Sequence, residues 1–191
     1  EGNDTVVAGA GNNTITGGAG NDSITSTGGE DSITAGDGND TVDAGDGNNA
    51  LIDGGAGNDS LTGGSGTDTI NGGAGNDTIA GEAGNSSIDG GEGDDTIVTT
   101  DNNDTIIGGA GADKITSGDG ADSMTGGSGA DTFIFEDVSD NGDDTQAGTA
   151  VDAGQKITDF RISEDRLDLE INISGLVRED FNGGTNEDGA T

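Results

Sequence analysis

The chain has 191 residues, of which 39 are acidic and 5 are basic, so its formal net charge is −34. Nucleic acid and anionic membrane surfaces are poor partners for such a chain because both are polyanions. Cys and His are absent, which excludes disulfides and the usual zinc, copper and haem ligands and leaves oxygen ligands suited to hard cations such as calcium.

Low hydrophobicity with high net charge is typical of disordered chains, but the order of the residues argues against disorder. An apolar residue returns every nine positions from the N-terminus to Phe133, apart from one step of ten that indicates an inserted residue near Asp53. The predicted inward residues are Val6, Ile15, Ile24, Ile33, Val42, Leu51, Leu61, Ile70, Ile79, Ile88, Ile97, Ile106, Ile115, Met124 and Phe133. This period predicts a repeat architecture of about fifteen units.

The aligned unit reads G-G-x-G-x-D-x-U-x, where U is apolar, and residues 72–80 are a clean copy. The triplet x-U-x predicts a short strand with U pointing inward, and the six preceding residues predict a loop that reverses the chain. The fourth position is Gly in every copy except Asn102, which indicates a backbone shape with positive φ. We therefore predict an all-β fold, a right-handed parallel β-roll (β-solenoid) with 18-residue coils and a C-terminal β cap.

The sixth position of the repeat separates two edges of the roll, because alternate loops lie on opposite sides. We call these the odd edge and the even edge, after the odd and even repeats. The odd edge has Asp in all eight copies: Asp4, Asp22, Asp40, Asp59, Asp77, Asp95, Asp113 and Asp131. The even edge has Asn13, Asp31, Asn49, Asp68, Ser86, Asp104 and Asp122.

One buried aliphatic residue in nine makes a thin core, so we expect bound metal to stabilise the roll, chiefly along the odd edge. Turn capping by Asp is the simpler alternative, but turn chemistry alone does not separate two edges.

The repeat resembles the calcium-binding nonapeptide repeat of RTX proteins, which are secreted by the type I route. The resemblance covers residues 1–135 and implies a calcium ion between loops one coil apart. One loop would supply its Asp and the carbonyl oxygens of positions one and three, and the next its Asp and the carbonyls of positions two and four. The resemblance thus implies about seven calcium ions on the odd edge and fewer on the even edge, where Asp31, Asp68, Asp104 and Asp122 are the candidate ligands. The implied carbonyl ligands are those of Gly17, Ala19, Gly36, Gly38, Gly54, Ala56, Gly72, Gly73, Ala74, Gly75, Gly90, Gly91, Glu92, Gly93, Gly108, Gly109, Ala110, Gly111, Gly127 and Gly129.

The pattern changes after Phe135. Residues 136–156 are acidic and small and predict a loop, with a candidate extra calcium site at Asp140, Asp143 or Asp144. Residues 157–191 are predicted to form the cap, because residues 156–162 and 164–169 alternate as strands do. This segment is similar to the one that follows the repeats in many type I secreted proteins, whereas the polar tail 182–191 lacks the apolar ending expected of a secretion signal there.

The function that the resemblance implies is a calcium-binding module that folds outside a bacterial cell, or at its surface, and supports type I secretion of a larger protein. Its expected partners are calcium ions, the rest of the parent polypeptide and the type I secretion machinery, without nucleic acid or membrane insertion. One alternative is a surface-binding or ice-binding module of an adhesin. Another is the non-catalytic part of a secreted protease, lipase or alginate epimerase. We expect no enzymatic activity within these residues, because neither H-E-x-x-H nor a Ser-His triad can form without His.

Overall fold

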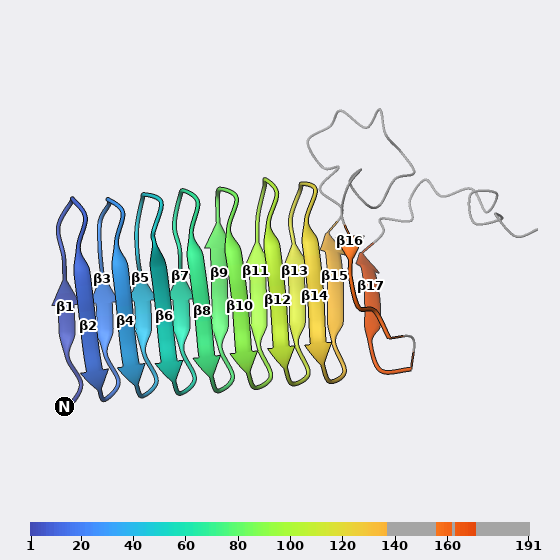
Figure 1. Ribbon diagram of the computed structural model, residues 1–191, viewed down its shortest axis with the longest axis horizontal. Coiled ribbons are helices and arrows are strands. Elements are labelled where there is room, and N and C mark those ends of the chain that lie inside the picture. The colour runs from blue at the N-terminus through green and yellow to red at the C-terminus, as the bar shows by residue number, and fades with distance from the viewer. Residues whose placement is uncertain (137–155, 162, 171–191) are drawn as a thin grey trace, which may run out of the picture.

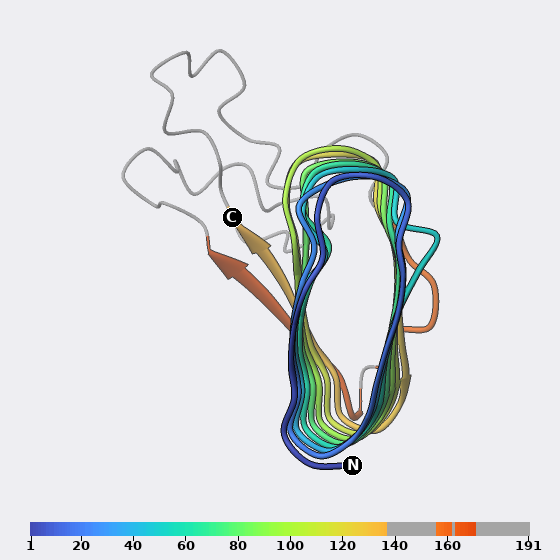
Figure 2. The ribbon, with the colours of Figure 1, turned by 90° about the vertical axis from the view of Figure 1, so that its left-hand side faces the viewer.

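The computed structural model describes residues 1–136, 156–161 and 163–170, and all regular elements in these residues are β-strands. The strands alternate between two parallel sheets that face each other along the whole roll (Figure 1). Viewed from its end, the chain follows one flattened, closed outline coil after coil (Figure 2). The predicted parallel β-roll is therefore confirmed, and no described helix is long and apolar enough to cross a membrane.

Among the described residues, nine strands form the odd sheet, and neighbours in it lie one coil apart. They are β1 (Thr5–Val7), β3 (Ser23–Thr25), β5 (Thr41–Asp43), β7 (Ser60–Thr62), β9 (Thr78–Glu82), β11 (Thr96–Thr99), β13 (Lys114–Ser117), β15 (Thr132–Glu136) and β17 (Arg166–Glu170).

In the same part of the chain, eight strands form the even sheet. They are β2 (Thr14–Ala19), β4 (Ser32–Asp37), β6 (Leu51–Ala56), β8 (Thr69–Ala74), β10 (Ser87–Glu92), β12 (Thr105–Ala110), β14 (Ser123–Ser128) and β16 (Lys156–Ile157). Most are six residues long because they run on into the loops of the odd edge, at the bottom of Figure 1.

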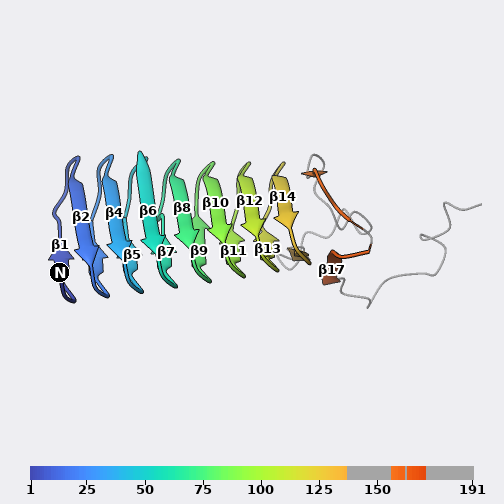
Figure 3. The same ribbon diagram turned by 60° about the horizontal axis from the view of Figure 1, so that its bottom comes forward.

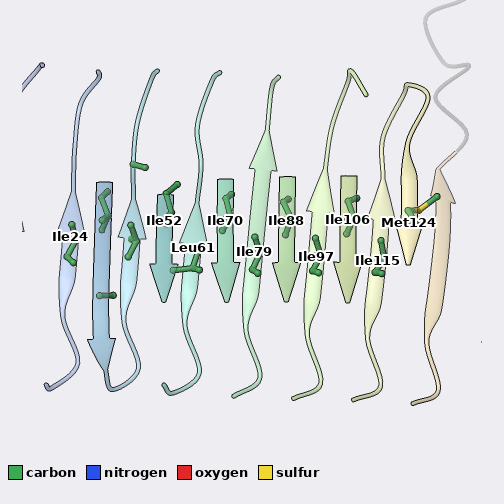
Figure 4. Close-up of a cluster of buried hydrophobic side chains, with 14 of the residues drawn as sticks. Ile24, Ile52, Leu61, Ile70, Ile79, Ile88, Ile97, Ile106, Ile115 and Met124 are labelled. Carbon is green, nitrogen blue, oxygen red and sulfur yellow. The ribbon is translucent and has the colours of Figure 1, made fainter. Parts of the chain in front are cut away.

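The core is one cluster of apolar side chains between the sheets, to which each sheet contributes its own row (Figure 4). Ile79 of β9 pairs with Ile97 of β11, and Ile70 of β8 pairs with Ile88 of β10, so like residues stack in register from coil to coil. These side chains are at most 1% exposed. Fixed stacking of the inward residues places every loop directly above the equivalent loop of the coil before it (Figure 3).

One predicted inward residue is wrong. Ile52, not Leu51, pairs with Ile33 and Ile70 and is fully buried, while Leu51 pairs with Ser32 and is only half-buried. The insertion lies at Ala50, whose N–H donates to the carbonyl of Asp31 as a strand residue would. Both neighbours are apolar, so the period alone could not distinguish them; the ladder of hydrogen bonds selects Ile52.

The cap adds one more coil to the roll. In β16, Ile157 pairs with Met124, and in β17, Leu167 pairs with Phe133. Predicted strands at 156–162 and 164–169 are thus observed in part, at Lys156–Ile157 and Arg166–Glu170. The candidate calcium ligands Asp140, Asp143 and Asp144 lie outside the described residues, as do residues 171–191 of the cap.

Candidate metal centre

The loops of the odd edge share one backbone shape. In the loop Gly54–Asp59, Gly55 and Gly57 have φ of 104° and 136°, a region that side chains rarely adopt. A Cβ on Gly55 would also collide with the carbonyl oxygen of Gly36, one coil earlier. The second and fourth positions therefore require glycine, and the stacked loops keep their carbonyl groups in register.

A ladder of buried aspartates runs along this edge. The N–H of Asp59 donates to Oδ1 of Asp77 (2.7 Å), and the N–H of Asp77 donates to Oδ1 of Asp95 (2.8 Å). The same bond links every coil from Asp4 to Asp131. All members except the exposed Asp4 are at most 3% exposed. The loops thus bring the predicted carboxylates together in a single column.

The second oxygen of each buried carboxylate is left without a hydrogen bond. This holds for Oδ2 of Asp22, Asp40, Asp59, Asp77, Asp95, Asp113 and Asp131. A buried polar atom without a partner costs about 1–3 kcal/mol, and more when it is charged. Because the same oxygen lacks a hydrogen-bond partner in coil after coil, the ladder indicates sites that a cation would fill.

Burial raises the pKa of these groups. The pKa of Asp77, of Asp95 and of Asp113 rises to about 6, chiefly because burial disfavours the charged form. The hydrogen bond from the preceding coil partly opposes the rise, and the neighbouring carboxylate adds to it. The ladder is therefore hard to ionise unless a cation compensates it.

Glycine at the first loop position leaves room for such a cation. A Cβ placed on Gly54 would lie 2.5 Å from Oδ2 of Asp59 and 2.5 Å from the carbonyl oxygen of Gly72, one coil further on. At Gly108 the corresponding distances are 2.5 Å to Asp113 and 2.6 Å to Gly126. Two oxygens that converge in this way, a carboxylate and a carbonyl, fit calcium, which takes oxygen ligands at about 2.3–2.6 Å.

The third-position carbonyls also lie between coils. The carbonyl oxygen of Ala56 accepts the N–H of Gly38, and that of Ala74 accepts the N–H of Gly57, each at 2.7 Å. A carbonyl oxygen has a second lone pair, so this bond leaves one available to a metal. Among the described residues no three acidic side chains gather at one point, so carbonyl oxygens must complete any site built on a pair of aspartates.

The even edge, at the top of Figure 1, is built differently. Its first loop position is often occupied by a side chain, such as Ser26, Ala44, Thr99 or Ser117, where the odd edge has glycine in all but one loop. Hydroxyl and amide groups bind the carboxylates: Ser26 Oγ donates to Oδ2 of Asp31 (2.6 Å), and Asn13 Nδ2 donates to its Oδ1 (3.1 Å).

The candidate aspartates of this edge are buried like those of the odd edge. Asp31, Asp68, Asp104 and Asp122 are at most 2% exposed. Burial raises the pKa of Asp68 and of Asp104, and each has an unpartnered Oδ2. Glu82 and Asn102 replace glycines and have φ of 54° and 97°, so these loops depart from the regular shape. Both oxygens of Asp31 are hydrogen-bonded, so Asp31 is less available to a metal than Asp68 or Asp104.

Two residues that sequence reasoning missed lie in the cap. Oδ1 of Asp165 accepts the N–H of Asp131 (3.1 Å), so Asp165 continues the odd ladder by one step. The carboxylate of Asp159 accepts the N–H groups of Gly126 (2.9 Å) and Gly127 (2.8 Å), where another coil would otherwise pair. The triplet Asp165-Arg166-Leu167 carries the D-x-U signal, but the residues inserted before it break the nine-residue spacing.

A comparison with known families agrees with this geometry. The model of the RTX calcium-binding nonapeptide repeat (4 copies) matches residues 1–33, 16–51, 49–79, 71–101 and 98–133, which together span more than half of the chain. No curated protein and no solved structure matches the chain.

Proposed function

Because the chain belongs to the family of the RTX calcium-binding nonapeptide repeat, we propose that calcium bound along its odd edge drives its folding outside the bacterial cell. Repeats of this family indicate a calcium-binding domain and are characteristic of type I secreted extracellular proteins. The observation that carries the proposal is the column of buried carboxylates, each with one oxygen lacking a partner.

Side chains and backbone carbonyl groups have different roles in the proposed calcium sites. The aspartates of adjacent coils supply the negative charge, from Asp22 to Asp131, and the loop glycines allow their carbonyl oxygens to face the same gap. Calcium, when bound, supplies the positive charge that the buried carboxylates lack. About seven ions fit the odd edge on this scheme, one for each pair of adjacent aspartates between Asp4 and Asp131.

Folding would follow calcium concentration. A ligand that binds only the folded chain shifts the equilibrium by mass action, and extracellular calcium modules bind with Kd of about 10⁻⁴–10⁻³ M. In a calcium-poor cytosol the self-repulsion of a chain at −34 favours the unfolded, exportable form. Outside the cell, calcium binds between the carboxylates of adjacent coils and the roll folds. After export, this module would be a folded segment of the larger secreted protein.

Circular dichroism with and without calcium tests the proposal. We expect little β-structure in excess chelator and a cooperative gain of β-signal at millimolar calcium, with calorimetry counting several ions per chain. Magnesium at the same concentration is the control, since it prefers a smaller octahedral site and retains its waters. A chain that is already β-rich in chelator would refute calcium-driven folding.

A further inference from the structure

One gap on the even edge has nearly everything that an odd-edge gap has. It lies between the loops 44–49 and 63–68 and is called the 49/68 gap. Its second and fourth loop positions are glycines with positive φ: Gly45 (73°), Gly47 (134°), Gly64 (89°) and Gly66 (136°). Asp68 is 1% exposed with Oδ2 unpartnered, and its loop begins with Gly63.

Asn49 holds the place of the second carboxylate in this gap. It is 1% exposed, and its N–H donates to Oδ1 of Asp68 (2.8 Å), as in the odd ladder. Its Oδ1 accepts the N–H of Asp31 (3.2 Å), which an aspartate could also do. The backbone position and the outward bond of Asn49 are therefore those of a ladder aspartate.

The gap differs from most odd-edge gaps at two points: Ala44 stands at the first loop position, where they have glycine, and Asn49 brings an amide nitrogen. Asn49 Nδ2 donates to the carbonyl oxygen of Gly63 (3.1 Å), and its hydrogen bonding to Asp68 opposes the burial that raises the pKa of that carboxyl. On the odd edge the corresponding first-position carbonyl, that of Gly72, faces the space beside Asp59 that a cation would need. The side-chain amide thus binds the carbonyl oxygen whose counterpart on the odd edge faces the space beside the carboxylate.

We propose that Asn49 takes the place of a calcium ion, so that the 49/68 gap is closed by hydrogen bonds and requires no metal. This inference rests on the proposed function, because it presupposes calcium in the odd gaps. The neighbouring coils extend the same device: Asn13 Nδ2 and Ser26 Oγ bind both oxygens of Asp31. The loops of the even edge from Asn13 to Asp68 are then held together by hydrogen bonds and need no metal, whereas the odd edge on the opposite side binds calcium.

A gain of binding tests this role. The double variant Ala44→Gly/Asn49→Asp removes the methyl group at the first loop position and the amide donor, and it supplies the missing carboxylate, while the other loop glycines and Asp68 stay in place. We expect the variant to bind one more calcium ion per chain than the wild type in equilibrium dialysis. Its folding midpoint should also shift to higher calcium, because the two adjacent carboxylates of the variant repel each other until an ion binds between them.

The double variant Ala44→Gly/Asn48→Asp is the matched control. It makes the same chemical change one residue earlier, on an exposed side chain whose Oδ1 accepts the N–H of Thr67 (2.9 Å), which a carboxylate can also accept. Its calcium count should equal that of the wild type. The inference is overturned if A44G/N49D, folded in calcium by circular dichroism, binds no additional ion, or if it fails to fold in saturating calcium while A44G/N48D folds. Absence of calcium uptake by the wild type would instead refute the proposed function.

Discussion

At the scale of single residues, the first loop position decides whether a carboxylate can reach a metal. The odd edge has glycine there in every loop except the one that begins with the buried Ala35. A methyl group at this position occupies the space on which the Asp oxygen and the next coil's carbonyl converge. The gap beside Asp40 should accordingly be the weakest of the odd column.

We expect Gly54→Ala to remove one calcium ion, because its new Cβ would lie 2.5 Å from both Asp59 Oδ2 and the Gly72 carbonyl. Crowding of this kind costs about 1–3 kcal/mol in a close-packed site. Calorimetry should show one ion fewer and a higher calcium midpoint. Ala35→Gly is the reciprocal control and should leave the count unchanged or raise it; equal losses in both variants would contradict the role of this position.

At the scale of elements, each strand contributes one inward residue, so its register determines what is buried. β6 is the instructive case because two apolar residues, Leu51 and Ile52, stand side by side. Ile52 lies in the core, whereas Leu51 is only half-buried. A shift of one residue would expose Ile52 and turn the following loop away from its neighbours.

Ile52→Ala should therefore lower the free energy of unfolding by about 2–5 kcal/mol, the usual cost of truncating a buried aliphatic side chain. Leu51→Ala should cost under about 1.5 kcal/mol, since surface and half-buried sites lose less. Denaturant titrations in saturating calcium measure both. A larger loss for Leu51→Ala would support the register predicted from the nine-residue period.

At the scale of the whole molecule, charge couples the coils to one another and to pH. The folded pKa values of Asp77, Asp95 and Asp113, about 6, exceed the usual value for aspartate, 3.8. Between these values the folded chain binds more protons than the unfolded one, so without metal its stability is greatest at low pH and is lost as pH rises through about 6. Calcium binding depends on pH in the opposite direction, because protons compete for the same oxygens.

Two titrations check this coupling. In calcium-free buffer, the β-signal should be larger at about pH 5 than at about pH 7, and the calcium affinity of the folded chain should fall as pH falls below about 6. Asp77→Asn should weaken both dependences, whereas Asp101→Asn, on an exposed side chain in a loop of the even edge, should not. Equal effects of the two variants would mean that overall charge, and not the buried ladder, carries the pH dependence.

The sequence by itself determined the repeat, the parallel roll, the oxygen-only ligand set and the contrast between the two edges. These follow from a local pattern that returns every nine residues, so each copy reinforces the assignment of the others. The same alignment of repeats shows that every odd repeat has Asp at the sixth position, whereas even repeats have Asn13, Asn49 and Ser86 at three of their sixth positions.

Only the tertiary structure decided which apolar residue of β6 is buried, which side chains replace metal, and where the ladder ends. Each depends on hydrogen bonds between coils, such as those that join Asn49 to Gly63 and to Asp68, 14 and 19 positions further along the chain. Asp165 joins Asp131 across 34 positions, because the chain between them departs from the repeat. A period in sequence predicts equivalent positions, but the atoms that fill each gap are set by what the next coil presents.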